Sequence, residues 1–465
     1  MPAVTDIFHE NTLREILHAS QNPSEQEIER ILEKGKKTKG ISLEEAALLL
    51  HVQDEALWEK IFHLAREIKE SIYGERIVFF APLYISSYCV NDCDYCGFHA
   101  RNLAPRKKLA LQEVEEQARI LIDMGHKRLL LEFGEHPLNT IDYVCDVITT
   151  IYGVAQGKGE IRRANVNIAA TTVEDYAKLK EVGIGTYQLF QETYHRETYE
   201  TLHKGPKADY ERQLFAHDRA FAGGLDDIGL GVLFGLYDYK FEVLALLAHA
   251  EYLDTKYGVG PHTISVPRFQ PAESVDFSSE HAVSEEELLK IIAILRIAVP
   301  YTGMIISTRE RPEIREKAFK IGISQTSAGS QTDPGGYRKK GETKSAEEKF
   351  ASQFQTADHR SLDEVVMSIL DQGLLPSFCT ACYREGRTGE DFMDIAKPGE
   401  IHNLCRPNAL LTFQEYLEDY ASEAVKKKGI DVLQKYLEEI ENPVRKKATI
   451  NRLERIRNGE RDLYF

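Results

Sequence analysis

The sequence lacks the features of a membrane-spanning or secreted protein. No stretch of its 465 residues approaches the apolar length that crossing a bilayer requires. Its start, MPAVTDIFHENTLREIL, has no basic segment followed by an apolar one, as a secretion signal would. Basic residues are the minority: 58 Lys and Arg stand against 74 Asp and Glu, a formal charge of −16. An acidic balance disfavours phosphate contacts, so we expect a cytoplasmic protein that binds neither membranes nor nucleic acid.

Cysteine is scarce, with 7 residues in the whole chain, and internal repeats and low-complexity tracts are absent. Six of the seven cysteines stand in two tight groups, and the seventh, Cys145, stands alone. In a reducing cytoplasm, clustered cysteines more often hold metal or do redox work than form disulfides. The hydrophobic share of 42% is enough for a sizeable core. The sequence therefore predicts a folded protein with two thiol-rich sites.

The order of apolar patterns predicts an α/β protein with helical extensions. Residues 1–75 show helical spacing, whereas residues 76–340 alternate short β-branched runs with amphipathic helices. Eight strand candidates in this region favour a TIM-type (β/α)₈ barrel, with an open doubly wound sheet as the alternative. They are VFFAPLYIS, RLLLEFGE, ANVNIAAT, TYQLFQE, IGLGVLFGL, HTISVPRFQ, MIISTRER and ISQTSAGS. Residues 341–465 are expected to form a mostly helical domain, with 341–360 as an exposed polar connection.

The first cysteine group, SSYCVNDCDYCGFH, follows the first strand candidate and has the spacing C-x₃-C-x₂-C over Cys89, Cys93 and Cys96. Loops after barrel strands form the active face of such folds. Three thiolates can fix three irons of a 4Fe–4S cluster and leave the fourth iron open for a ligand with an amine and a carboxylate. The alternative is a zinc site completed by His99, although zinc ligands usually come in two separated pairs.

This stretch resembles the radical S-adenosylmethionine (SAM) enzymes. The resemblance implies that SAM occupies the open iron and that the reduced cluster splits SAM to give a 5′-deoxyadenosyl radical. It also implies a set of SAM contacts. These are Tyr95 beside the adenine, Gly134 and Glu135 at the amine, Gln191 and Glu192 at the end of the fourth strand, and Arg212 at the carboxylate. Phe133 replaces the first glycine of the family's Gly–Gly–Glu stretch, so that match is partial. For Glu192 and Arg212, an ordinary ion pair is an equally good interpretation.

The second cysteine group has the spacing C-x₂-C-x₂₂-C over Cys379, Cys382 and Cys405. It predicts an auxiliary iron–sulfur cluster with an open iron, and a Cys₃His zinc site that uses His402 is the alternative. The two groups together resemble the HydG family of tyrosine lyases, which mature FeFe-hydrogenase. The similarity runs from about residue 78 to the end and includes SVPRFQPAE, STRERPE, SAGSQTDPGGY, SFCTACYREGRTGEDFM and LCRPNALLTFQEYLEDYA.

The resemblance implies a specific reaction. The radical removes a hydrogen from the amino group of L-tyrosine, and Cα–Cβ cleavage gives p-cresol and dehydroglycine. Carbon monoxide and cyanide then form and are captured as an Fe–CO–CN unit on the auxiliary cluster, which is either 4Fe–4S or a five-iron form with a dangling iron. In that family a free cysteine bridges this iron and a histidine ligates it, a role that falls here on His262. The implied partners are a ferredoxin or flavodoxin as electron donor and other hydrogenase maturation proteins.

Tyrosine also needs a partner for its carboxylate. Arg309 in STRE is our first candidate because a bidentate guanidinium suits a carboxylate, and Arg268 in VPRF is the second. Arg268 is alternatively the ion-pair partner of Glu192. Ser327 and Ser330, with Gly335 and Gly336, line the path of small intermediates or shape a turn.

Two other functions remain open on the sequence. One is a tyrosine lyase like ThiH of thiamine synthesis, which shares the barrel motifs but lacks the second trio. The other is a non-catalytic iron–sulfur scaffold with two clusters.

Overall fold

The computed structural model describes residues 3–273, 275–339, 342 and 350–465. Eight parallel strands form a closed barrel in the order β10-β9-β8-β7-β6-β5-β2-β1, and β10 pairs with β1 to close it. The alternation of strands and helices thus produced the expected barrel rather than an open sheet. Among the described residues, no helix has the length and apolarity that crossing a membrane takes.

The eight predicted strands are all present, although most are shorter than their apolar runs. They are β1 (Arg76–Ser86), β2 (Arg128–Phe133), β5 (Arg163–Asn167), β6 (Tyr187–Gln188), β7 (Ile228–Gly231), β8 (Thr263–Ser265), β9 (Gly303–Ile306) and β10 (Gln325–Ser327). β1 is buried along almost its whole length, as a parallel strand covered on both faces should be. A small hairpin of β3 (Ala155–Gln156) and β4 (Gly159–Glu160) was not predicted.

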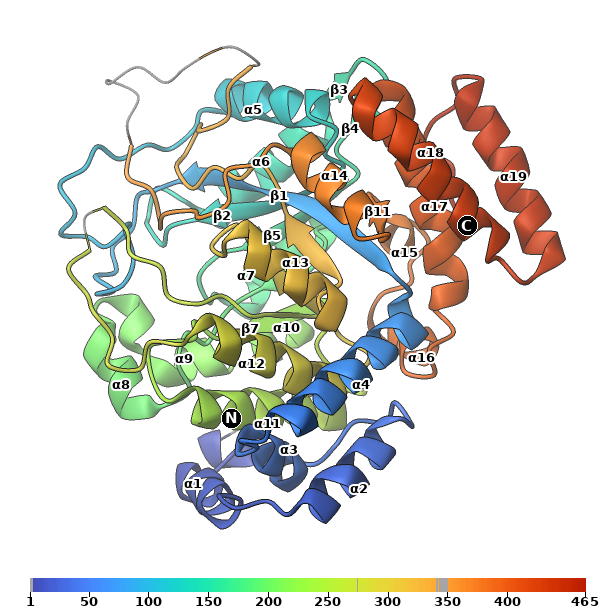
Figure 1. The fold of residues 1–465 in the computed structure, drawn as a ribbon. Coiled ribbons are helices and arrows are strands. Elements are labelled where there is room, and N and C mark those ends of the chain that lie inside the picture. The colour runs from blue at the N-terminus through green and yellow to red at the C-terminus, as the bar shows by residue number, and fades with distance from the viewer. Residues whose placement is uncertain (1–2, 274, 340–341, 343–349) are drawn as a thin grey trace.

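Helices between the strands cover the outside of the barrel (Figure 1). Several begin at a Ser or Thr whose hydroxyl accepts a backbone N–H, as at Thr140, Thr172 and Ser284. The helices of this region are α5 (Leu111–Asp123), α6 (Ile141–Tyr152), α7 (Val173–Val182), α8 (Arg196–Leu202), α9 (Tyr210–Leu214), α10 (Ala216–Ala222), α11 (Tyr239–Tyr257), α12 (Glu285–Ala298) and α13 (Pro312–Ile321).

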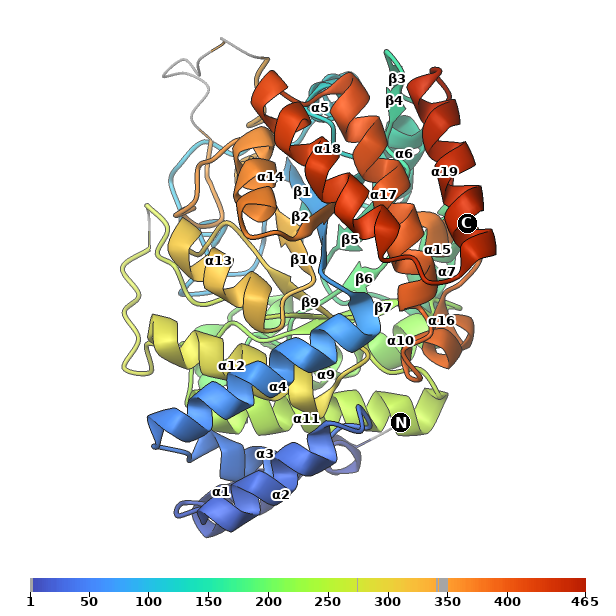
Figure 2. The same ribbon diagram turned by 45° about the vertical axis from the view of Figure 1, so that its right-hand side comes forward.

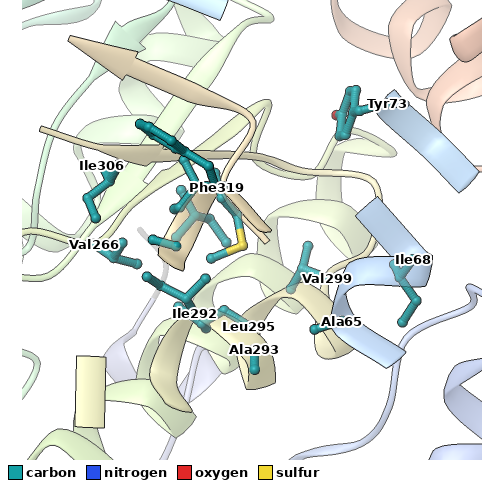
Figure 3. Close-up of a cluster of buried hydrophobic side chains, with 14 of the residues drawn as sticks. Ala65, Ile68, Tyr73, Val266, Ile292, Ala293, Leu295, Val299, Ile306 and Phe319 are labelled. Carbon is teal, nitrogen blue, oxygen red and sulfur yellow. The ribbon is translucent and has the colours of Figure 1, made fainter. Parts of the chain in front are cut away.

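The N-terminal extension is helical and packs against one side of the barrel. It contains α1 (Glu10–Ala19), α2 (Glu25–Gly35), α3 (Leu43–Leu50) and α4 (Glu55–Tyr73). α1 and α3 pack on α11, and α4 packs on α12 and α13. Figure 3 shows this contact: Ala65 of α4 lies beside Val299 and near Leu295, and Ile68 lies farther along α4. Burial of these apolar side chains joins the extension to the barrel in one hydrophobic core.

The C-terminal region is also mostly helical and adds a strand to the barrel sheet. Its elements are α14 (Leu362–Asp371), β11 (Leu375–Ser377), α15 (Ala381–Arg384), α16 (Gly389–Ala396), α17 (His402–Asp419), α18 (Glu423–Glu438) and α19 (Pro443–Arg457). β11 pairs in parallel with the first residues of β1, with Arg76 opposite Leu375. Figure 2 shows α17, α18 and α19 grouped on the outside of this edge. The second cysteine trio is therefore joined to the end of the barrel at which β1 begins.

The expected exposed connection at residues 341–360 is only partly correct where the structure describes it. Residues 341 and 343–349 lie outside the described residues. After them, Ala351, Phe354 and Asp358 are buried, and Gln353 accepts a hydrogen bond from Tyr84 (2.7 Å). The polar composition of the segment concealed its few apolar anchors, which fold it back over the barrel.

Candidate functional site: two thiol-lined cavities in one barrel

The upper cavity lies at the carboxyl ends of the barrel strands. All three cysteines of the first trio line it, together with Tyr84, Tyr95, Glu132, Gly134, Glu135, Glu192, Lys207, Arg309, Ser327, Ser330 and Phe354. The loop after β1 supplies the cysteines, and the ends of the other strands supply most of the polar groups. This is the face on which barrel enzymes build their active sites.

The three thiols of this loop are free and suited to hold a cluster. Burial raises the pKa of Cys93 well above its ordinary value and raises that of Cys96 to about 11. Neighbouring thiolates add to both shifts. Buried thiolates that repel one another gain much from a bound cation, so the donor set fits an iron–sulfur cluster.

Gly134 allows the cysteine loop to lie directly against the end of β2. A Cβ atom at this position would stand 2.3 Å from the carbonyl oxygen of Tyr88 and 3.1 Å from Cβ of Cys89. The Gly134 amide also donates to Ser86 O (3.0 Å). The glycine is thus required by the close approach of two backbones, one of which carries a cluster ligand.

We expect Gly134→Ala to displace the loop at Tyr88 and cost about 1–3 kcal/mol, as overpacking of a tight contact does. Thermal unfolding and the iron content after reconstitution would measure the effect. Gly153→Ala is the control, because its Cβ would meet nothing closer than 3.4 Å. Equal iron content in the two variants would contradict the expectation.

Glu135 is held in the cavity wall by two partners. Nη2 of Arg212 donates to Oε1 of Glu135 (2.6 Å), and Nδ2 of Asn91 donates to Oε2 (2.7 Å). Asn91 lies between Cys89 and Cys93, so the carboxylate is fixed relative to the cysteine loop. Arg212 does not itself line the cavity. Its predicted contact with the SAM carboxylate stays a prediction, and the structure places it behind Glu135.

Glu192 projects from a strained backbone position. Its φ of 69° lies in the left-handed region that non-glycine residues rarely adopt. Its carboxylate accepts a hydrogen bond from Nζ of Lys207 (2.7 Å). Burial acts to lower the pKa of Lys207, but Glu192, Cys93 and Tyr199 outweigh it and the net shift is upward. A fixed cation therefore lies beside the cysteine loop.

Tyr95 and Gln191 differ in their relation to the upper cavity. The Tyr95 hydroxyl is hydrogen-bonded to Nε2 of His203 (2.7 Å), which fixes the ring in the cavity wall next to Cys96. Gln191 is buried but does not line the cavity, and its Nε2 has no partner among the described residues. The structure thus places Tyr95, but not Gln191, where a cofactor in the cavity would be reached directly.

The two candidate arginines have different environments. Arg309 lines the cavity with its guanidinium carbon 3.3 Å from the ring centre of Phe354, and its guanidinium has no hydrogen-bond partner among the described residues. Burial lowers its pKa. Arg268 donates from Nε to both carboxylate oxygens of Glu310 (3.0 and 3.1 Å) and from Nη1 to Val283 O (2.8 Å).

One assignment for Arg268 is therefore wrong: its guanidinium is not the partner of Glu192, because Lys207 holds that carboxylate. The predicted contact of Arg268 with a substrate carboxylate stays a prediction, and Glu310 occupies its bidentate face. Ser327 lines the cavity and its hydroxyl accepts the Thr308 amide (3.3 Å), while the Ser330 hydroxyl lines it without a partner in the described chain.

The lower cavity lies at the opposite end of the barrel. Its lining includes the second trio and cationic groups, and its residues are Tyr73, Arg76, Val78, Arg128, His262, Gln325, Cys379, Thr380, Ala381, Cys382, Tyr383, Phe392, Ile401 and Cys405. In Figure 1, β1 runs from this end, beside α16, toward the cysteine loop at its other end. The chain thus brings together Cys379 and Cys382 at the start of α15 with Cys405 on α17.

Positive groups surround the lower thiols. Burial raises the pKa of Cys379, and burial with the neighbouring thiols raises that of Cys382 to about 12. Arg76 is hydrogen-bonded to Cys405, and Arg128 donates to Cys379 O (2.7 Å). His262 stacks on Phe392 and has Nδ1 3.2 Å from Oδ2 of Asp227. This donor set also fits a cluster, with arginines to balance its negative charge.

Neither zinc alternative is supported by the packing. His99 does not line the upper cavity, and His402 does not line the lower one, where His262 lies instead. In the part of the chain that is described, no three His, Cys, Asp or Glu side chains come close enough together to hold a single metal ion. Thiols spaced around a cluster are farther apart than the ligands of one zinc ion.

One apolar layer separates the two cavities inside the barrel. Val78 and Arg128 line the lower cavity, and the next inward residues of the same strands, Phe80 and Leu130, line the upper one. Phe80, Leu130 and Ile305 form a buried cluster at this level. Both thiol sites therefore open into the same barrel interior.

Comparison with known proteins agrees with this architecture. A family model of the Radical SAM superfamily matches residues 83–250, and one of the Biotin and Thiamin Synthesis associated domain matches residues 265–375. The 2-iminoacetate synthase of Escherichia coli (strain K12) is 30% identical over 321 residues, which cover 68% of this chain and 81% of that protein.

Two solved structures resemble nearly the whole chain. A crystal structure of HydG, a maturase of the FeFe-hydrogenase, has 54% identity and a TM-score of 0.94, and the match covers 99% of this chain and 100% of that one. HydG from Carboxydothermus hydrogenoformans has 41% identity and a TM-score of 0.85, with 97% and 100% covered.

The closed barrel, the cysteine loop after β1 and the family models define a radical SAM enzyme, which uses a 4Fe–4S cluster and SAM. The similarity to 2-iminoacetate synthase makes it a radical SAM lyase. Within this class, the chain belongs to the HydG family.

Sequence reasoning missed several groups of the two cavities. Lys207, Asn91 and His203 hold predicted site residues in place, and no spacing in the sequence indicated them. Glu132 had a usable signal, because an acidic residue within the apolar run RLLLEF is unusual for a buried strand. Arg76 and Arg128 stand at the first position of β1 and β2, where the strand pattern alone does not show that they face inward.

Proposed function

We propose that this lyase cleaves the Cα–Cβ bond of L-tyrosine to p-cresol and dehydroglycine. Dehydroglycine is then converted to carbon monoxide and cyanide, which leave as an Fe–CO–CN unit for assembly of FeFe-hydrogenase. The observation that carries the proposal is a pair of three-thiol sites facing one barrel interior. The similarity of the chain to HydG, a maturase of the FeFe-hydrogenase, and to a 2-iminoacetate synthase supports it.

The residues of the two cavities suit them to different steps of the reaction, and the upper cavity suits the radical step. Cys89, Cys93 and Cys96 would hold a 4Fe–4S cluster that, with SAM, supplies a reductively generated organic radical. Arg309 is the cation available for a substrate carboxylate in the same cavity. Phe354, from the buried part of the segment after residue 349, stacks against the Arg309 guanidinium.

The lower cavity would serve the second half of the reaction. Cys379, Cys382 and Cys405 would hold the auxiliary cluster, and His262, which lines the same cavity, would ligate an additional iron. The Asp227 carboxylate lies 3.2 Å from Nδ1 of His262, near enough to act on the ring electrostatically. Arg76 and Arg128 make this end of the barrel favourable for anions such as cyanide. Free cysteine, an electron donor and other maturation proteins complete the proposed set of partners.

Anaerobic reconstitution followed by incubation with SAM, L-tyrosine and dithionite tests the proposal. We expect p-cresol, cyanide and carbon monoxide. Formation of p-cresol without the two diatomic products would favour the 2-iminoacetate synthase type of activity, which the 30% identical relative suggests. Absence of SAM cleavage would favour a non-catalytic scaffold.

We expect Arg309→Lys to weaken tyrosine binding by about tenfold to a hundredfold, because lysine cannot form the bidentate contact of a guanidinium. Cleavage of SAM without tyrosine should continue, since Arg309 forms no hydrogen bond or ion pair with Glu135, which is held by Arg212 and Asn91. Steady-state kinetics with varied tyrosine would show the effect as a raised KM. An unchanged KM would exclude Arg309 as the carboxylate partner.

A further inference from the structure

Among the described residues, three acidic side chains line the upper cavity, and one of them lacks a cationic partner. Glu135 is paired with Arg212, and Glu192 is paired with Lys207. Glu132 has no salt bridge to any described residue, although it is 8% exposed and lines the cavity. An acidic group that is buried without a counter-charge is costly. Its retention in the cavity calls for a ligand that compensates it.

Glu132 lies at a defined level of the barrel interior. In the strand register it is directly opposite Tyr84 of β1 and Asn167 of β5, and all three line the cavity. Asn167 is hydrogen-bonded to the Glu132 carboxyl, and the Tyr84 hydroxyl is directed to Gln353. The other charged groups that act on Glu132 are Arg309 and Glu192.

Arg309 is the cationic counterpart of Glu132 in this respect. It lines the cavity, and no acidic side chain among the described residues is hydrogen-bonded to it. It lies close enough to Glu132 to interact with it electrostatically, yet the two groups form no ion pair. Arg309 and Glu132 thus line the same cavity without forming an ion pair with each other. Their opposite charges match the two charged ends of a zwitterionic α-amino acid. Arg309 suits the carboxylate, which leaves Glu132 for the ammonium group.

We propose that Glu132 binds the α-ammonium group of the amino-acid substrate and accepts one proton from it. This inference rests on the proposed function, in which a hydrogen atom is then removed from the substrate nitrogen. The N–H bond breaks with its electron pair left on nitrogen, and the proton forms an O–H bond with Glu132. The products of the step are a neutral amine and a neutral carboxylic acid, so atoms and charge balance.

The environment of Glu132 suits this transfer. Burial raises its pKa to about 8, against a weaker opposite effect of Asn167 and Arg309. A peptide α-amino group has a pKa of about 8, and that of a free amino acid is about one unit higher, so transfer of the proton to Glu132 is uphill by only about tenfold. An exposed carboxylate would be several orders of magnitude too weak a base for the same task.

Binding of three ligands to the reconstituted protein, without reductant so that no turnover occurs, tests the assignment. The ligands are L-tyrosine, 3-(4-hydroxyphenyl)propanoate, which lacks the amine, and tyramine, which lacks the carboxylate. Wild type should bind tyrosine at least about tenfold more tightly than the acid without the amine, as one charge-assisted contact provides. Glu132→Gln should bind the two within about threefold of each other, because its amide compensates an ammonium group far less well.

Two further variants make the result specific. Glu132→Asp keeps a carboxylate and should retain part of the preference for the amine, which a purely structural role would not predict. Glu116→Gln on exposed α5 is the matched control and should behave as wild type. Retention of the full wild-type preference in Glu132→Gln would overturn the proposal for Glu132. If wild type instead bound L-tyrosine, the analogue without the amine and tyramine with equal affinity, the proposed function would be overturned.

Thermal unfolding at several pH values gives a test that is independent of ligands. The folded-state pKa of Glu132 lies above its unfolded value, so wild type loses stability as pH rises through about 8. Glu132→Gln lacks this ionisation. The Tm of the variant minus the Tm of wild type should therefore increase from pH 6.5 to pH 9. Parallel Tm profiles would show that Glu132 is compensated within the protein and would contradict the proposal.

Discussion

Replacement of Cys93 with serine is expected to abolish both SAM cleavage and p-cresol formation. Cys93 is the most central thiol of the loop after β1, buried at 5% exposure between Cys89 and Cys96 in the chain. A serine hydroxyl has a much higher pKa than a thiol and does not replace thiolate at an iron–sulfur cluster. Loss of one of three ligands removes the site at which the radical is generated, so both products should fall at least about a hundredfold.

Cys145→Ser is the matched control for this experiment. Cys145 lies on α6, away from both cavities, and its thiol has only a long contact to Lys178 O (3.9 Å). Iron content, 5′-deoxyadenosine and p-cresol should all remain at wild-type levels in this variant. Normal p-cresol formation by Cys93→Ser would exclude the first trio as the radical-generating site, whatever the iron content.

The barrel could be predicted from the sequence because the alternation of apolar runs and amphipathic helices is repeated along the chain. Amphipathic helices lie between most of the eight apolar runs, and errors at single strand ends do not change the topology. β11 could not be predicted in this way, since Leu375–Ser377 is three residues long and contains a proline. It forms because β1 extends beyond β10 at its start and leaves Arg76 and Ile77 to pair.

The candidate site was predictable where ligand spacing is local and unpredictable where partners come from distant loops. Both cysteine trios follow from short spacings, and the structure places each in one cavity. By contrast, the choice of Glu310 rather than Glu192 for Arg268 depends on how two loops pack after different strands. Polar composition likewise concealed the burial of Phe354 over Arg309. Such pairings are set by tertiary packing, which periodicity does not report.

Replacement of Cys382 with alanine should separate the two halves of the reaction. The second trio lies at the other end of the barrel, behind the layer formed by Phe80, Leu130 and Ile305. The loop after β1 and the groups around Arg309 do not depend on it. We therefore expect Cys382→Ala to retain SAM cleavage and p-cresol formation while it loses roughly half of its reconstituted iron, as the loss of one of two clusters requires.

The same variant should form little or no carbon monoxide and no iron–carbonyl species in the infrared spectrum. Some cyanide can persist, because dehydroglycine also decomposes without a cluster. His262→Ala should give a milder form of this pattern, with the auxiliary cluster present and the additional iron poorly held, because its ring lines the lower cavity beside the thiols. Full carbon monoxide output from Cys382→Ala, or zinc in the wild-type site, would make the second trio structural. The activity would then be that of a tyrosine lyase which ends at dehydroglycine.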